Sequence, residues 1–496
     1  MMVAHLTVLP QLVLLLGAAL LPLRPRWLRA ENIALAALGL AFALWLPLAQ
    51  RVLSTGPVSY HLGGWPPAVG IEVVSDTLSV YFGGIVFLLS LPAATFACSS
   101  LAAEVPIAAH SSFWTLYLLL VMSLLALSLA ADLFNTYVFI EISSLAACAL
   151  IATVNRPLNI EATFKYLILS TVGSGCILMA TLLLYMLGGQ LNLSLLAQAL
   201  PQQAALFPKN LIAAGTFLLV GLGVKSALFP LHSWLPDAHS VAPSPASALL
   251  SGLVVKIYVL VLLRVAWGTL GGSFLSLLPF QEVLLFLATV SIFLGSIFAI
   301  AQSDLKRMLA YSTVAQMGYV FLGLAANNET AFTGAVLHLF NHAILKATLF
   351  LAAGGIIWQT GERRLRNLVG VGHRCPIALS AFSLAALGMI GIPGTAGFTS
   401  KWFLVVGCLQ GGTPVLAWVI LLSSLLNAIY YLPVVILGFF GHSDQCETRF
   451  HLDQMPLGLL IPICFLALCT LFFGLWPSPP LVLAQDIAYQ FFYHGR

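Results

Sequence analysis

Apolar runs close to the length of a membrane-spanning helix recur along the whole chain, separated by short stretches rich in Pro, Gly and charged residues. A run of about 20 apolar residues is long enough to cross a bilayer as a helix. A transmembrane barrel would instead show alternating segments of about ten residues. We therefore predict an all-α polytopic membrane protein. Its fourteen predicted spans lie near 3–23, 32–50, 75–97, 113–130, 133–153, 162–187, 210–229, 243–267, 283–301, 308–325, 330–357, 377–409, 414–440 and 456–475.

Composition agrees with this pattern. The chain has 496 residues, of which 60% are hydrophobic and 7% charged, and its mean hydropathy of +1.02 excludes a soluble globular class. The net charge of +4 is too small and too dispersed to indicate a nucleic-acid partner. The eight cysteines form no C-x-x-C pair and no iron-sulfur spacing, and no Walker or dinucleotide glycine pattern occurs in a suitable context. We expect no cofactor, no metal and no redox centre in this chain.

The first apolar run is too long for a signal-peptide core and lacks a charged leader, so we retain it as a helix. Positive charges are unevenly divided between alternate loops, and positively charged loops usually face the cytoplasm. This asymmetry predicts a bacterial-type plasma membrane protein with both termini on the outer side. The loops predicted to be cytoplasmic carry Arg24, Arg26, Arg29, Arg156, Lys306, Arg307, Arg363, Arg364, Arg366 and Arg374, and the opposite loops carry Arg51, Lys209 and Arg264.

Two parts of the chain resemble each other at a nearly constant offset. The segment beginning at Asp132 is similar to the one at Asp304, and Gly189-Gln-Leu-Asn-Leu is similar to Gly361-Glu-Arg-Arg-Leu, both 172 residues apart (304 − 132 and 361 − 189). Five predicted helices separate the copies, and an odd number predicts opposite orientations, as in inverted-repeat transporters. Chance similarity between apolar helices is the alternative explanation.

Two predicted spans contain backbone breaks beside a lysine. Lys225 precedes Phe229-Pro230 and Leu235-Pro236-Asp237, and Gly391-Ile-Pro-Gly precedes Lys401, at an offset of 176 from Lys225. Proline removes a helix hydrogen-bond donor, and broken helices are common at transporter sites.

Lys225, Lys256, Lys346, Lys401 and Glu141 fall inside predicted spans. A lysine at the bilayer centre costs about 2.5 to 3.5 kcal/mol on insertion scales, so such groups usually mark an ion or proton route. Opening and closing an ion pair can switch the protonation state of such groups. The alternative is a structural scaffold in which the charges only hold helices together.

The span near 330–357 places His338, His342 and Lys346 four residues apart, on one helix face. Histidine titrates near neutral pH, so this face is a candidate central relay between two half-routes. Histidines that only bond neighbouring helices are the alternative. A zinc site is less favoured because no nearby acid completes a ligand set. His232 and His239 follow the first break and could equally be packing contacts.

Five segments resemble a known family. They are DLFNTYVFIEISSLA, the long segment from Val224 to Lys256, DLKRMLAYSTVAQMGYV, HLFNHAILKATLFLAAGGI and GIPGTAGFTSKWFL. Over residues 110–440 they are similar to the antiporter-like subunits shared by respiratory complex I, membrane-bound hydrogenases and the Mrp multisubunit sodium/proton antiporter. The resemblance implies fourteen helices, two inverted five-helix repeats and broken helices at spans 7 and 12.

Carried over by motif, the resemblance implies that Glu141 is the fifth-helix glutamate of the family. Lys225 and Lys256 match its seventh- and eighth-helix lysines, and Lys401 matches its twelfth-helix ionisable group. Because the family positions that match Glu141 and Lys225 are an acid and a base, the resemblance implies a switchable ion pair between them. It also implies partner membrane subunits and a role in moving protons and possibly Na+. The implied division is 1–110 for helices 1–3, 111–268 for helices 4–8, 280–440 for helices 9–13, and 441–496 for the C-terminal loop and helix 14.

Within this family, the chain length, the lysine at 401 and the short tail favour a likeness to the D-type member of Mrp antiporters. The alternative is a proton-pumping subunit of an NADH:quinone oxidoreductase or a membrane-bound hydrogenase. Such a chain would be a transporter subunit, and it could form part of an NADH dehydrogenase-type enzyme complex. A redox enzyme in its own right is disfavoured because no ligand pattern for haem, flavin or iron-sulfur is recognisable.

Overall fold

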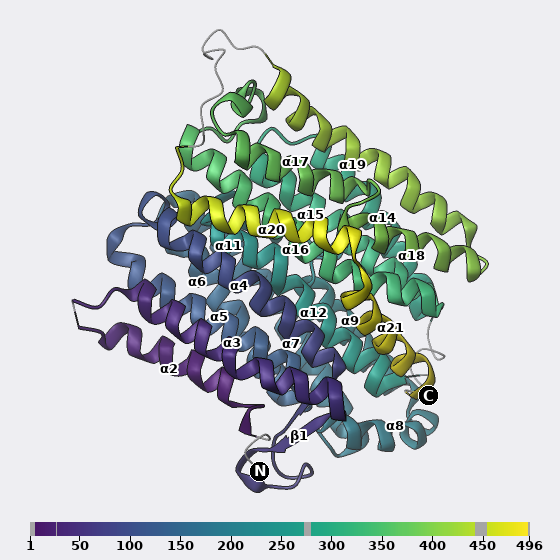
Figure 1. The fold of residues 1–496 in the computed structure, drawn as a ribbon. Coiled ribbons are helices and arrows are strands. Elements are labelled where there is room, and N and C mark those ends of the chain that lie inside the picture. The colour runs from purple at the N-terminus through teal and green to yellow at the C-terminus, as the bar shows by residue number, and fades with distance from the viewer. Residues whose placement is uncertain (1–4, 26, 272–278, 442–453, 495–496) are drawn as a thin grey trace.

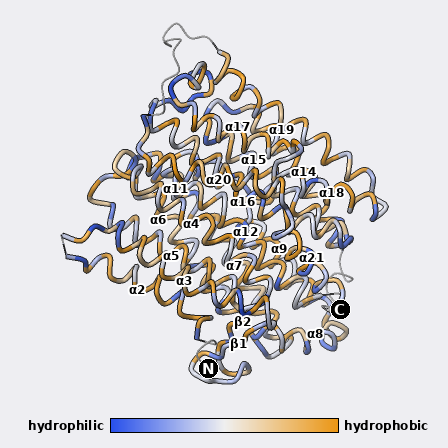
Figure 2. Tube along the Cα trace, viewed as in Figure 1, coloured by the Kyte–Doolittle hydropathy of each residue, from blue (hydrophilic) through white to orange (hydrophobic). Residues whose placement is uncertain are grey.

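The protein is a bundle of long helices that run side by side (Figure 1). The structure, a computed structural model, describes residues 5–25, 27–271, 279–441 and 454–494. Arg26 and residues 442–453 of the predicted C-terminal loop lie outside the described residues. The helices are mostly apolar along their lengths, and polar segments gather near their ends (Figure 2).

The first part of the chain forms three helices and a small hairpin. Strands β1 (Val58–His61) and β2 (Glu72–Ser75) are antiparallel, with Val58 opposite Ser75. The hairpin was not predicted, because each strand has only four residues and no apolar run marks it. The helices of this group are α2 (Leu9–Leu23), α3 (Ala30–Thr55) and α4 (Thr77–Glu104).

We call the segment from His110 to Leu270 the first half. The helix α9 is followed by a break and by the short α10, and α11 to α12 continue through π-helical turns at Leu250–Val254 and Leu263–Leu270. A surface helix, α8, was not predicted. The helices of the first half are α5 (His110–Leu129), α6 (Leu133–Ala152), α7 (Pro157–Gly188), α8 (Leu193–Leu206), α9 (Pro208–Lys225), α10 (Trp234–Val241), α11 (Ser244–Leu249) and α12 (Val255–Leu262).

We call the segment from Phe280 to Phe440 the second half. Proline occupies the first turn of both α17 and α19, where its missing N–H costs no helical hydrogen bond. The helices of the second half are α14 (Phe280–Ile300), α15 (Leu305–Ala325), α16 (Glu329–Thr360), α17 (Pro376–Ile390), α18 (Ala396–Gln410) and α19 (Pro414–Phe440). Two helices follow, α20 (Leu457–Leu475) and α21 (Ser478–Tyr489), and the second of these was not predicted.

Among the described residues, eleven helices are long and apolar enough to cross a membrane. The other three predicted spans correspond to α2, to the broken pair α9/α10 and to the broken pair α17/α18. The predicted breaks at spans 7 and 12 are therefore present, and the all-α polytopic prediction is confirmed. The first break comes earlier than predicted, because α9 ends at Lys225 and not near residue 229.

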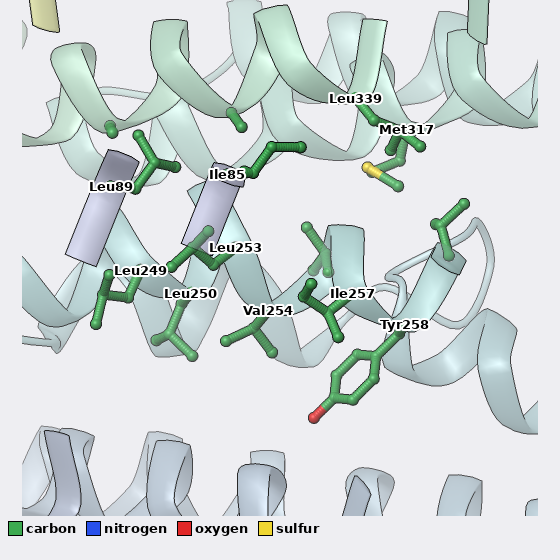
Figure 3. Close-up of a cluster of buried hydrophobic side chains, with 14 of the residues drawn as sticks. Ile85, Leu89, Leu249, Leu250, Leu253, Val254, Ile257, Tyr258, Met317 and Leu339 are labelled. Carbon is green, nitrogen blue, oxygen red and sulfur yellow. The ribbon is translucent and has the colours of Figure 1, made fainter. Parts of the chain in front are cut away.

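The centre of the bundle is formed where α4, α11, α12, α15 and α16 meet (Figure 3). Ile85 and Leu89 of α4 lie opposite Leu253 of the π-helical turn, and Met317 and Leu339 complete the cluster. All five side chains are buried. The helices that carry Lys256, His338 and Lys346 are thus fully enclosed by other helices, and the lysines on them are shielded from lipid.

The two halves share a local backbone arrangement. In the first half, Leu133 N–H donates to Leu191 (2.9 Å) and Leu193 N–H donates to Ala131 (2.9 Å). In the second, the residues 172 positions later make the same two bonds, at 3.0 and 2.9 Å. Asp132 and Asp304 also cap α6 and α15 in the same way. This correspondence is what an internal repeat requires.

Candidate functional site

Lys225 lies at the end of α9, where the helix breaks. Its side chain is 1% exposed, and its ammonium donates to Ser144 Oγ (2.7 Å) and Ser170 Oγ (2.6 Å). Helix C-termini attract positive charge, since their last carbonyls lack helical partners. The ammonium also lies 6.0 Å from the ring centre of Tyr258, whose hydroxyl bonds Ser144 (3.2 Å). The Tyr258 hydroxyl points away from the apolar cluster (Figure 3).

Glu141 lies on α6, one turn before Ser144. Its Oε1 atom is buried and has no hydrogen-bond partner in the structure. Within the described part of the chain, Glu141 and Lys225 form no direct ion pair, although they are close enough to interact electrostatically. The structure therefore lacks the direct Glu141–Lys225 contact that was predicted, and Lys225 instead bonds a hydroxyl one helical turn from the acid.

Lys256 is completely buried on α12. Its ammonium donates to the carbonyl of Ser251, inside the π-helical turn that precedes it. The widened turn leaves this carbonyl available to the side chain five residues later. Ser251 Oγ in turn bonds Thr313 Oγ1 of α15 at 2.8 Å, which links the first half to the second.

The predicted face of α16 is present and buried. The rings of His338 and His342 are parallel, 4° apart, with centres separated by 5.7 Å. His338 bonds Ser400 (2.9 Å) and Gln316 (3.0 Å), one through each ring nitrogen. By contrast, neither ring nitrogen of the buried His342 has a partner in the structure.

Lys346 completes this face. Its ammonium donates to the Leu309 carbonyl (2.7 Å), to Ser312 Oγ and to the Tyr431 hydroxyl (3.4 Å). Its side chain is entirely shielded from solvent. All of these partners are neutral, so only dipoles hold the ammonium.

Lys401 lies just after the second break, on α18, and is 5% exposed. Its ammonium donates to the carbonyls of Met389 (2.7 Å) and Ile390 (3.1 Å), the last residues of α17. Ser424 Oγ is a third acceptor at 3.1 Å, and the ring centre of Tyr319 lies 4.9 Å away. The break therefore supplies the oxygen atoms that hold this charge.

The structure thus buries the predicted ionisable residues in several polar clusters. Within the described residues, no hydrogen bond joins the Lys225 cluster to Lys256, or His342 to any of them. Sequence reasoning missed the neutral partners within these clusters. Polar residues on the same spans as the lysines were the available signal. These missed partners are Ser144, Ser170, Ser251, Tyr258, Ser312, Thr313, Gln316, Tyr319, Ser400, Ser424 and Tyr431.

Lys306 differs from its prediction as an exposed loop charge. It is 5% exposed in the first turn of α15, and its ammonium donates to the Ala242 carbonyl (3.2 Å). His239, after the first break, is fully buried and stacks on Phe350 at 4.9 Å, so its packing contact is real. Within the described ranges, no three His, Cys, Asp or Glu residues converge as metal ligands.

Comparison with known proteins identifies the family to which the chain belongs. The family described as "NADH:quinone oxidoreductase/Mrp antiporter, TM" matches residues 130–427. The chain belongs to this family. The match contains every predicted site residue, from Glu141 to Lys401, and both broken helices. The family resemblance seen in the sequence is confirmed.

Two relatives within the NADH:quinone oxidoreductase/Mrp antiporter family are named as subunits of different kinds of complex. The "NADH-quinone oxidoreductase subunit N" of Desulforudis audaxviator is 40% identical, with 96% of each chain covered. The D-type Na(+)/H(+) antiporter subunit of Bacillus subtilis is 28% identical, with 96% of this chain and 95% of the relative covered. Both are named as subunits of larger assemblies.

A solved structure agrees with the fold. A chain of the membrane-bound sulfane sulfur reductase, described as an archaeal respiratory membrane complex, matches with a TM-score of 0.89 and 26% identity. The match covers 99% of this chain and 97% of that one. Members of the family are therefore multi-pass subunits of multisubunit membrane complexes, as predicted for this chain.

Proposed function

We propose that this chain translocates protons through its buried lysines, hydroxyls and histidines, as one subunit of a membrane complex. The observation that carries the proposal is the setting of Lys256, Lys346 and Lys401, whose ammonium groups bond only to neutral oxygens. A buried charge without a counter-ion is costly, so a small movement of its partners can make it release its proton. Lys225 adds a nearby acid, Glu141, to the same arrangement.

The chemistry of the path favours protons over sodium. Sodium is a hard cation that needs several oxygen ligands and is repelled by ammonium groups. Four lysines and one glutamate occupy these buried polar clusters. Protons pass between such groups by exchange, and no bare cation has to enter a positively charged interior.

We infer that electron transfer in an oxidoreductase complex drives this movement. The 40% identity with the N-type oxidoreductase relative along nearly the full length supports this inference. The 28% identity with the D-type antiporter relative gives weaker support to an antiporter. The D-type Mrp function is the second candidate, and the lysine at position 401 favours it. Mass spectrometry of the native complex separates the two, because redox subunits would accompany the chain only in the first case.

The proposal is tested with the native complex in sealed vesicles, with internal pH followed by a fluorescent dye. The Lys225→Ala variant should assemble, as judged by native gel electrophoresis, and should lose proton uptake. A structural scaffold predicts the reverse, with impaired assembly and normal flux in whatever complex remains. Normal uptake by the assembled variant would refute the proposed route.

We also propose that the arginine-rich end of the bundle faces the cytoplasm. With fourteen crossings, loops after odd-numbered helices lie at one end, and they include Arg156, Arg364 and Arg374. The positive-inside tendency supports this orientation. Labelling of single cysteines at Arg156 and at Gly412 with an impermeant thiol reagent, in right-side-out vesicles, tests it. Only the cysteine at position 412 should react.

A further inference from the structure

The short helix α10 covers the Lys225 site. At its start, the Trp234 indole N–H donates to the Val224 carbonyl (2.8 Å), next to Lys225. The same indole ring stacks on Tyr166 of α7, with ring centres 4.2 Å apart and planes 10° apart. The position of α10 therefore decides how closely the end of α9 is covered.

The first turn and the C-terminal end of α10 contact cations of the second half. Arg307 of α15 pairs with Asp237 at 3.1 Å. Lys306 donates to the Ala242 carbonyl at 3.2 Å, and Arg363 donates to the Ser240 carbonyl. Carbonyls at a helix C-terminus lack helical partners and attract positive charge. We call these four side chains, Asp237, Lys306, Arg307 and Arg363, the α10 clamp.

Asp304 contacts two residues of the α10 clamp. Its carboxylate accepts from the backbone N–H of Arg307 (2.9 Å) as the cap of α15, and it pairs with the Arg363 side chain at 3.3 Å. In the opposite direction, Asp237 also pairs with Lys165 of α7 at 3.3 Å. Asp237 is thus shared between a cation of its own half and a cation of the other half.

The exposure of the Asp237–Arg307 ion pair argues against a purely stabilising role for this contact. The side chains of Asp237 and Arg307 are 26% and 42% exposed. Ion pairs with this exposure contribute little to stability, because water screens them. Contacts of this strength can break and re-form during a working cycle at little cost. They join two elements that belong to different halves, and one of those elements covers a proposed proton-carrying lysine.

We propose that Asp237 is a positioning residue that couples the two halves, with Arg307 of α15 controlling through it how closely α10 covers Lys225. The effect of this contact on transport rests on the proposed proton translocation. The effect of the contact on the position of α10 does not depend on that proposal. A shift of α15 in the second half moves Arg307, which releases or restores the contact with Asp237. The first half then opens or closes around Lys225.

The test uses the intact complex and a native thiol. Cys148 is buried on α6, one turn beyond Ser144, within electrostatic range of Lys225. Its rate of modification by N-ethylmaleimide, read by mass spectrometry of its peptide, reports exposure of the Lys225 site. Asp237→Asn and Arg307→Gln should each raise this rate about fivefold or more. The double variant should raise it no further than Asp237→Asn alone, because both single variants break the Asp237–Arg307 contact.

Glu161→Gln is the matched control. Glu161 pairs with Lys165 at 2.8 Å and, within the described residues, makes no ion pair with the α10 clamp, so its loss should leave Cys148 protected. Arg307→Lys keeps the charge opposite Asp237 and should restore protection. If Arg307→Gln prevents assembly, Asp237→Asn tests the same contact from the other side. Cys148 rates equal to those of Glu161→Gln in both single variants would overturn the proposal.

Proton uptake measured on the same vesicles separates the proposed role of the α10 clamp from the proposed proton translocation. Higher Cys148 rates together with slower or uncoupled uptake support both proposals. Higher Cys148 rates in a complex whose wild-type form shows no proton uptake would support the clamp and refute the proposed function. Unchanged Cys148 rates with normal wild-type uptake would refute the clamp alone.

Discussion

Lys225 and Lys401 occupy corresponding breaks in the two halves, yet their charges are held differently. Lys225 donates to the side-chain hydroxyls of Ser144 and Ser170, on two other helices. Lys401 donates mainly to the backbone carbonyls of Met389 and Ile390, at the end of the preceding half-helix. Hydroxyls can rotate and can also donate, whereas carbonyls only accept. The first site can therefore change its hydrogen-bond pattern by hydroxyl rotation, whereas the second site presents mainly fixed acceptors.

The halves also differ in their acids. The residue 172 positions after Glu141 is Thr313 (313 − 141), which bonds Ser251. An acid therefore stands near Lys225, while the matching position in the second half carries a neutral hydroxyl. The same backbone arrangement can thus favour the charged lysine in two ways, by a movable counter-ion or by fixed dipoles.

The largest expected effect tests whether Lys401 supplies charge or proton exchange. We expect Lys401→Ala to slow proton uptake about a hundredfold or more, equivalent to about 2.7 kcal/mol of barrier. Lys401→Arg should fail as completely, because arginine stays protonated at any accessible pH. Lys401→Glu should keep part of the activity, because glutamate can still titrate. An active Lys401→Arg variant in the vesicle assay would show that this position supplies only positive charge.

Removal of the acid tests the asymmetry between the halves. We expect Glu141→Gln to slow proton uptake about tenfold or more, which is about 1.4 kcal/mol of barrier. Thr313→Val, at the matching position, removes only a neutral hydroxyl and serves as the control, with a smaller loss. If both variants slow uptake equally in the assembled complex, the counter-ion of the first half is not what distinguishes it.

The central face should show a moderate effect that separates relay from packing. We expect His342→Leu to slow uptake about threefold, about 0.7 kcal/mol of barrier, while leaving thermal stability unchanged because neither ring nitrogen is bonded. His338→Leu leaves Ser400 and Gln316 without their partner, at a cost of about 1 to 3 kcal/mol in stability for each orphaned group. Wild-type turnover in the double variant would assign both rings to packing.

The smallest expected effect concerns two tyrosines in similar positions. Tyr258 bonds Ser143 (2.9 Å) and Ser144 (3.2 Å), and Tyr431 bonds Ser312 (3.0 Å). Each phenylalanine variant should lose about 0.5 to 1.5 kcal/mol of stability, the usual worth of one hydrogen bond. Uptake should slow about twofold in both, about 0.4 kcal/mol of barrier. Initial rates of dye quenching check this, and a much larger loss for either tyrosine would place its hydroxyl directly on the route.

Much of the fold could be predicted because its signals are local. A run of apolar residues has the same length requirement wherever it occurs, so the fourteen spans were recognisable. Proline and glycine act on their own backbone, so the breaks after Lys225 and before Lys401 were also predicted. The α8 and α21 helices were missed because each is shorter and more polar than a membrane span.

Which lysines and histidines enter the membrane follows from their positions within apolar runs, and the sequence alone was enough to select Glu141, Lys225, Lys256 and Lys401. What each one bonds to depends on how separate helices are rotated and packed. Lys225 and Ser144 are 81 residues apart, and only the packing of both α6 and α9 against α7 brings them together. The lack of a direct Glu141–Lys225 contact and the burial of Lys306 also depend on tertiary contacts. Apolar helices can rotate about their axes with little change in hydrophobic burial, so hydropathy does not select one set of partners, and the close packing of the whole bundle does.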